Sequence, residues 1–292
     1  MTPTYWPNQN GSPMSYASLL VHVETGGASS DARLDLATSL ARRFGASLIG
    51  VGAEAVRPPP ADDFGGPALI GEMMAAEEEQ IRADLKVAEQ SFRNHPGFQG
   101  LTTEWRSAVD LPVEVLARES RSADLVIVGR DLERLRAGPY RSADPGAVIM
   151  AAGRPVLVVP PSGDRLSARC VVVAWKDARE ARRAVWDALP FLRAAESVHV
   201  VEITSEADLD RANRRVGDVV RHLERHEIKA DGGVRSQGQA AAADEIILVA
   251  EHHGADLIVA GGYGHARLRE WVFGGVTRDL LRHCPKCCLL SH

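Results

Sequence analysis

The sequence has few cysteines and no surplus of positive charge. Four cysteines among 292 residues are too few for a disulfide framework in a chain of this size. A net charge of −5 provides no broad basic surface for nucleic acid. No apolar run reaches the ~18 residues that a membrane-spanning helix needs. We therefore expect neither a nucleic-acid partner nor a membrane association.

Several signatures of targeting and catalysis are also missing. Residues 1–15 lack the basic and apolar regions of a secretory signal and are rich in Pro, Asn, Gly and Ser, so we expect a loose tail and a cytoplasmic protein. The phosphate-binding motif GxxxxGK[ST] is absent, as are the SGGxDS and HxGH signatures of nucleotide-handling enzymes. We therefore expect no catalytic residues.

Three of the cysteines form a cluster near the C-terminus, Cys284, Cys287 and Cys288, which contains a CxxC spacing. A metal or redox site is one interpretation. However, no second CxxC exists, and 287–290 reads as a buried strand in which cysteine is a small apolar residue. We favour a core role for these residues and for Cys170, and we expect no metal site.

The chain as a whole has the composition of a globular protein, with 45% hydrophobic and 25% charged residues. Strand and helix patterns alternate along it, which predicts parallel sheets. The same order occurs twice, in a first domain at 16–160 and a second at 168–292. The expected strands are 19–23, 47–51, 101–105, 125–128 and 155–159, then 170–175, 197–203, 229–235, 257–260 and 287–290.

The clearest echo between the two halves lies at their fourth strands. ADLVIVG at 123–129 corresponds to ADLIVAG at 255–261. Two copies of one five-stranded α/β unit account for the whole length.

The second copy carries spaced glycines directly after this strand. Gly261 and Gly264 follow the apolar run, and Gly274 and Gly275 precede a helix that is expected to start near Val276. Glycine lets the backbone approach a ligand, and the first turn of a helix offers unpaired N–H groups. The arrangement can therefore cradle a phosphate, although the same glycines can serve only as tight turns.

The first copy differs at this place. Asp144–Pro145 stands where the second copy has Gly274–Gly275. Aspartate is a strong N-cap, and its carboxylate would cover the N–H groups that a phosphate needs. We predict that the first domain does not bind nucleotide.

These motifs resemble the universal stress protein family, whose nucleotide-binding members carry Gly, two residues, Gly, nine residues, Gly, and then Ser or Thr. Gly261, Gly264 and Gly274 have this spacing, but Gly275 replaces the hydroxyl residue, and Thr277 lies two positions further on. The resemblance covers nearly the whole chain. It implies two tandem adenine-nucleotide-binding HUP-like domains, each an α/β sandwich with a five-stranded parallel sheet of order 3-2-1-4-5.

The resemblance also implies where a nucleotide would lie. Ala174, Trp175, Lys176 and Val201, at the ends of the first two strands of the second domain, would lie near the adenosine, although 175–178 does not match the family's Asp-containing turn. A tryptophan at a strand end either stacks or packs, and we favour packing for Trp175. The expected phosphate contacts are Gly261, Gly264, His265, Arg267, Gly274, Gly275, Val276 and Thr277, with His265 and Arg267 either contacting phosphate or staying solvated.

The function implied is a stress-response protein that binds ATP or AMP, with Mg²⁺ accompanying ATP, as a regulatory ligand in its second domain, with at most slow hydrolysis. The alternative is a nucleotide-free scaffold that binds a protein partner. In the family, domains pair through their last strands. Internal pairing of 155–159 with 287–290 would therefore make the chain a pseudo-dimer, and two chains could pair again as a homodimer.

Overall fold

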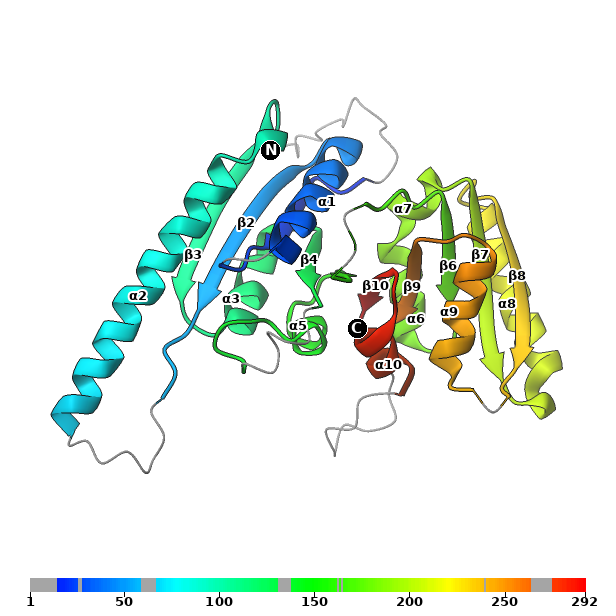
Figure 1. Cartoon of the computed structure of the whole chain (residues 1–292). Coiled ribbons are helices and arrows are strands. Elements are labelled where there is room, and N and C mark those ends of the chain that lie inside the picture. The colour runs from blue at the N-terminus through cyan, green and yellow to red at the C-terminus, as the bar shows by residue number, and fades with distance from the viewer. Residues whose placement is uncertain are drawn as a thin grey trace, which may run out of the picture.

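The computed structural model describes residues 15–25, 28–58, 67–130, 138–161, 163, 165–238, 240–263 and 275–292. Within these residues, strands and helices alternate in two consecutive units (Figure 1). The first unit comprises β1 (Ser18–His22), α1 (Ala28–Phe44), β2 (Ser47–Glu54), α2 (Pro67–Arg93), β3 (Thr103–Val109), α3 (Pro112–Glu119), β4 (Leu125–Gly129), α5 (Pro145–Ala151) and β5 (Val156–Val159). The second comprises β6 (Cys170–Ala174), α6 (Arg179–Asp187), α7 (Leu189–Ala194), β7 (Ser197–Thr204), α8 (Leu209–Glu224), β8 (Ala230–Ser236), α9 (Ala242–His252), β9 (Leu257–Gly261), α10 (Gly275–His283) and β10 (Cys287–Ser291).

All ten of these strands form one sheet, in the order β3-β2-β1-β4-β5-β10-β9-β6-β7-β8. Each unit therefore has the order 3-2-1-4-5, as the family resemblance implied. The strands within each unit are parallel, and the two units meet where β5 and β10 pair antiparallel, with Cys288 opposite Val158 and Leu290 opposite Val156. The last strands of the two units thus cover each other's edges.

The sheet has a hydrophobic core on each face, and both cores continue across the junction. On one face, α1, α2, α6, α7 and α8 cover a cluster that includes Leu157 and Leu289. On the other face, α3, α5, α9 and α10 cover a second cluster, in which Cys284 and Cys288 pack among aliphatic side chains. Continuous burial on both faces explains why the central strands are uninterrupted apolar runs.

An aspartate at the start of the fourth strand of each unit fixes the chain that leads into the first strand. Asp124 accepts hydrogen bonds from the backbone N–H groups of Ala17 at 2.8 Å and Ser18 at 3.1 Å. Asp256 accepts them from Ser167 at 2.7 Å and Ala168 at 2.9 Å, and Ala168 has a φ of 47°. The repeated Ala-Asp-Leu sequence therefore has a structural cause, because one carboxylate satisfies two N–H groups that precede a strand.

Aromatic side chains join the two units on the face that carries α1. Tyr16 packs edge-on against Phe44 at 5.1 Å and Phe191 at 5.7 Å between ring centroids. The Tyr16 hydroxyl donates to the carbonyl of Asp187 at 2.6 Å. Because Phe191 and Asp187 belong to the second unit, this contact adds to the strand pairing at the junction.

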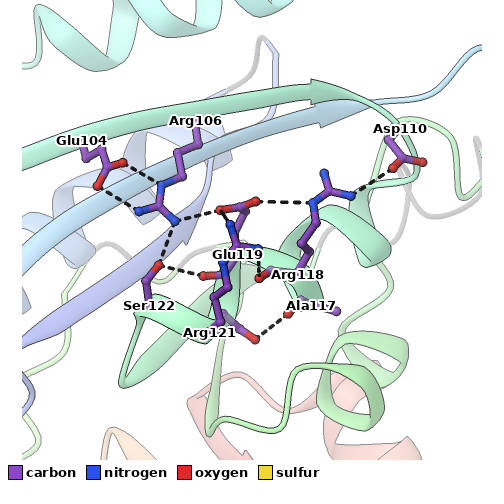
Figure 2. A network of polar contacts seen from close by, with 9 residues as sticks. Glu104, Arg106, Asp110, Ala117, Arg118, Glu119, Arg121 and Ser122 are labelled. Carbon is purple, nitrogen blue, oxygen red and sulfur yellow. Dashed lines mark hydrogen bonds and ion pairs between the residues drawn. The ribbon is translucent and has the colours of Figure 1, made fainter.

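The outer strand β3 is protected by charge. Arg106 bonds both Glu104 and Glu119, and Arg118 links Glu119 to Asp110, so that β3 is tied to α3 (Figure 2). The hydrogen bonds from Arg106 lower the pKa of Glu104. Charged side chains along an edge strand discourage its pairing with another sheet.

Two elements differ from the sequence expectation. The helical stripe at 181–192 is broken into α6 and α7 at Ala188, because Pro190 has no N–H with which to continue the α6 hydrogen bonds. The third strand runs from Thr103 to Val109 rather than from 101 to 105, because Leu101 still closes a turn onto the carbonyl of Phe98. The other strands agree within a few residues at their ends.

None of the helices in the described parts of the chain is both long enough and apolar enough to cross a membrane. The domain boundaries at 16–160 and 168–292 stay predictions, and the expected tail falls almost wholly outside the described residues.

We predict that Asp256→Ala lowers the free energy of unfolding by about 1–3 kcal/mol, because it leaves two N–H groups before β6 without their acceptor. The same change at Asp124 has a similar effect before β1. Urea denaturation measures both. The control is Asp218→Ala, which removes an exposed carboxylate paired with Arg221 and changes stability by less than about 0.5 kcal/mol. An Asp256→Ala protein as stable as this control would contradict the role given to the carboxylate.

Candidate functional site

The candidate phosphate site begins where β9 ends at Gly261. A Cβ on Gly261 would lie 2.6 Å from the backbone nitrogen of Ala181 and 2.8 Å from the carbonyl carbon of Glu180. Such distances are too short for any side chain, so glycine is required here by the close approach of β9 to the first turn of α6. This requirement is independent of a ligand.

Gly275, the first residue of α10, has different surroundings. A Cβ added to it would meet nothing within 4 Å among the described atoms. The residue before it is also a glycine, which has no side chain to cap the helix. Among the described residues, nothing crowds the start of α10, and backbone N–H groups in the first turn of a helix are the groups that bind an anion.

Thr277 connects the start of α10 to the end of β9. Its side chain is buried, and its hydroxyl lies 3.4 Å from the carbonyl oxygen of Gly261, to which it donates, and 3.4 Å from the N–H of Tyr263, from which it accepts. The Thr277 hydroxyl therefore links Gly261 and Tyr263, at the end of β9, to the first turn of α10. The sequence spacing left open whether Thr277 reaches the site. Its neighbour Val276 is partly buried against the hydrophobic core that α3, α5, α9 and α10 cover.

Four of the predicted contacts, Gly264, His265, Arg267 and Gly274, lie outside the described residues.

The predicted adenosine contacts lie at the end of β6, directly after it, and within β7. The carbonyl of Val201 accepts the N–H of Trp175 at 2.8 Å, and Ala174 is opposite Val201 in the sheet. Trp175 packs against the hydrophobic cluster beneath α6 and α8, as expected, with its indole nitrogen buried and unpaired among the described residues. Lys176 is exposed. The neighbouring Asp177 carboxylate accepts a hydrogen bond from Arg182 at 2.6 Å.

The corresponding helix start in the first unit is closed. Asp144 is the N-cap of α5, and its carboxylate accepts the N–H of Ala147 at 3.1 Å. The sequence prediction that this side chain covers the helix start is confirmed. An anion at α5 would have to displace a carboxylate and its negative charge.

A buried ion pair fills the neighbouring space in the first unit. Glu24, after β1, lies 3.0 Å from the guanidinium of Arg33, which also donates to the carbonyl of His22. Both side chains are almost fully buried, and a Cβ on Gly129 would overlap the Arg33 guanidinium. Gly129 is the counterpart of Gly261; beside Gly129 lies the Arg33 side chain of α1, whereas beside Gly261 lies the backbone of the first turn of α6.

The Glu24 carboxylate remains ionised in this position. Burial raises its pKa, but the charges of His22 and Arg33 and hydrogen bonds from Arg33 and Ser142 outweigh burial and lower the pKa to about 2. No local sequence pattern marked Arg33 as the partner of Glu24.

The loop of the second unit also touches the first unit. The backbone of Tyr263 adopts a φ of 51°, and its hydroxyl lies against Gly146 in the first turn of α5. Burial and the charge of Asp144 raise the pKa of Tyr263. From the other direction, Arg130 donates to the carbonyl of Leu280 in α10 at 3.0 Å. The candidate site is therefore supported by residues of both units.

We predict that the Glu24–Arg33 pair makes stability fall in acid. Because the folded pKa of Glu24 is below its unfolded value, its contribution of roughly 3 kcal/mol is fully present above about pH 4.3 and is lost as the pH falls towards about 2. Urea denaturation between pH 6 and pH 3 measures roughly half of this loss. The double variant Glu24→Gln/Arg33→Met, which removes both charges, should show a correspondingly smaller fall, and an equal fall would refute the assignment.

The family match covers the second unit alone, whereas the structural matches cover nearly the whole chain. Residues 168–292 match the model of the Universal stress protein family. No curated protein matches the sequence.

Solved structures match nearly the whole chain. A universal stress protein from Archaeoglobus fulgidus DSM 4304 is 13% identical, with a TM-score of 0.64, over 94% of this chain and 95% of its own. A putative universal stress protein from Pseudomonas aeruginosa UCBPP-PA14 is 15% identical, with a TM-score of 0.56, over 94% and 93%. A functionally unknown protein from P. aeruginosa PAO1 is 14% identical, with a TM-score of 0.55, over 94% and 92%.

At such identities the structures establish only the fold. Residues 168–292 therefore match the universal stress protein family, and the whole chain has the fold of solved universal stress proteins.

Proposed function

We propose that this protein is a stress-response regulator whose second domain binds an adenine nucleotide, ATP or AMP. The observation that carries the proposal is the contrast between two equivalent helix starts. At α5 the Asp144 carboxylate caps the helix, whereas at α10 the first residue is Gly275, and no described atom lies within 4 Å of a Cβ added to it. One start is closed to anions, and the other can accept them.

In this proposal the phosphates lie between the β9 loop and the first turn of α10. Gly261, Gly275, Val276 and Thr277 form the described part of that cradle, and Gly264, His265, Arg267 and Gly274 complete it. The base and ribose lie towards Ala174, Trp175, Lys176 and Val201. Magnesium would accompany the phosphates of ATP and reduce their charge.

The nucleotide acts as a regulatory ligand in this proposal, with at most slow hydrolysis. Tyr263 and Arg130 link the cradle to the first domain, so occupancy can alter the surface that a protein partner recognises. A nucleotide-free scaffold would have the same fold, so measurements of nucleotide binding separate the two functions.

We predict that Gly275→Ser strengthens ATP binding by about three- to tenfold. No described atom would clash with a Cβ at this position, and the serine hydroxyl adds one hydrogen bond to a phosphate oxygen. Isothermal titration calorimetry of the full chain measures the dissociation constant. Gly275→Ala is the matched control, because it adds the Cβ without the hydroxyl and should bind like the wild type. Equal affinities for Ser and Ala would argue against phosphate at this position.

A second prediction concerns the loop glycine. AMP or ATP should be detected by mass spectrometry of the natively purified protein, and Gly264→Val should abolish this binding by filling the space that phosphate needs. Gly71→Val, on an exposed part of α2, should retain the nucleotide. If nothing co-purifies and millimolar ATP leaves the melting temperature unchanged, the scaffold function replaces the proposed one.

A further inference from the structure

A buried arginine lies beside the cysteines near the C-terminus. Arg130 directly follows β4 of the first unit and is only 8% exposed. Its guanidinium donates to the carbonyl of Leu280 in α10 at 3.0 Å, and the same carbonyl accepts the N–H of Cys284 at 3.1 Å. The guanidinium and Cys284 therefore lie against the same turn of the chain at the end of α10.

Arg130 has no carboxylate partner among the residues that the structure describes. Burial lowers the pKa of its guanidinium, and the groups whose charge would oppose this effect are the thiols of Cys284, Cys287 and Cys288. An arginine keeps its proton, and a buried cation without an anion is costly unless a neighbouring group becomes negative. Among these neighbours, the thiols are the groups that can ionise.

The three cysteines do not lie on the same face of the sheet. Cys284 and Cys288 belong to the core that α3, α5, α9 and α10 cover, whereas Cys287 belongs to the core on the opposite face. Neighbouring residues of a strand alternate between the faces, which separates Cys287 from Cys288. The thiols of Cys284 and Cys288 share a hydrogen bond. The fold thus pairs Cys284 with Cys288, and not with Cys287 of the CxxC spacing.

The two paired thiols are chemically unequal. The hydrogen bond from Cys288 lowers the pKa of Cys284 and outweighs burial, and the backbone at Lys286 and the charge of Arg130 lower this pKa further. For Cys288 the same hydrogen bond and burial both raise the pKa. The thiolate, and not the thiol, is the nucleophile in sulfur chemistry. Cys284 is therefore the reactive member, and Cys288 stays protonated beside it.

A buried thiol reacts only with a small reagent. The side chain of Cys284 is buried, but its chain neighbours His283 and Pro285 are exposed. Cys284 follows the last residue of α10, and the ends of helices open locally at a low cost in free energy. Such an opening admits a molecule close in size to water. Hydrogen peroxide has this size, carries no charge and oxidises thiolates.

We propose that Cys284 and Cys288 form a peroxide-sensitive dithiol, which hydrogen peroxide converts into a disulfide. The Cys284 thiolate attacks one oxygen of the peroxide and the O–O bond breaks. The other oxygen leaves as hydroxide and takes up the proton released by Cys284, which gives water and a sulfenic acid on Cys284.

The sulfur of Cys288 then attacks the sulfur of the sulfenic acid. An S–S bond forms, the S–O bond breaks, and the hydroxyl leaves as water with the proton of Cys288. The pair of thiols thus loses two electrons, and one peroxide is reduced to two waters. The disulfide fixes the end of α10 to β10, the strand through which the two units pair.

Mass spectrometry locates this bond. Trypsin cleaves after Lys286 and so separates Cys284 from Cys288. The full chain, reduced and free of nucleotide, is treated with about a tenfold molar excess of hydrogen peroxide, and the remaining thiols are then alkylated with N-ethylmaleimide in denaturant. After digestion, peptides 283–286 and 287–292 should be found joined by a disulfide.

Variants separate the roles of the residues. Cys287→Ala should leave the joined peptides unchanged, whereas Cys288→Ala should abolish them and leave a sulfenic acid on Cys284 that dimedone traps. Arg130→Met should slow the oxidation by at least about threefold, because it removes the cation beside the thiolate, and Arg130→Lys should restore most of the rate. Thermal melting checks that each variant is folded.

Cys170 is the internal control. It is partly exposed, whereas the other cysteines are buried, so exposure alone would make it the first to react. Oxidation of Cys170 without joined peptides would overturn the proposal, as would joined peptides in Cys288→Ala, their loss in Cys287→Ala, or an unchanged rate in a folded Arg130→Met protein. The cysteine variants decide the pairing whether or not Arg130→Met folds. Because the assay contains no nucleotide, its outcome is independent of the proposed nucleotide binding.

Discussion

The antiparallel pairing of β5 with β10 is the contact on which the rest of the molecule depends. Each unit alone would end in an apolar strand, with Leu157 or Leu289 beside an unpaired edge. Such an edge readily recruits another chain. Joining the two edges forms one ten-stranded sheet with a continuous core on each face, so that the two domains support each other. The remaining edge strand of the first unit carries the Glu104–Arg106 network.

The same pairing brings the candidate phosphate loop into contact with the other domain. Tyr263 lies against the first turn of α5, and Arg130 reaches the last turns of α10. The helix that would accept a phosphate is therefore held at one end by its own loop, through Thr277, and at the other by the first unit. Rigid support of this kind is what a precise anion site needs.

Much of the fold could be predicted from the sequence, because strands buried on both faces are long apolar runs and the order of elements repeats. The repeated Ala-Asp-Leu sequence located the fourth strands, and Asp144–Pro145 predicted the closed helix start correctly. Sequence patterns predict the structure correctly where a residue interacts with residues close to it in the chain. The break at Ala188 follows from Pro190, but it was hidden by the apolar stripe that continues through it.

What the sequence did not reveal depends on residues far apart in the chain. Arg33 looks like an exposed helix residue until the fold places it against Glu24 and Gly129. Thr277 is two positions from the expected hydroxyl, and only the helix geometry brings it to Gly261. The need for glycine at Gly261 arises from α6, which no motif includes.

The covalent link between the two units has an evolutionary meaning. In a dimer of two identical chains, a mutation that caps one helix start necessarily caps the other, so one site cannot be lost while its twin is kept. Here Asp144–Pro145 and Gly274–Gly275 occupy equivalent positions in the sequence of a single polypeptide. A single polypeptide can therefore carry a capping carboxylate at one helix start and glycine at the equivalent place in its other half, which a dimer of identical chains cannot do.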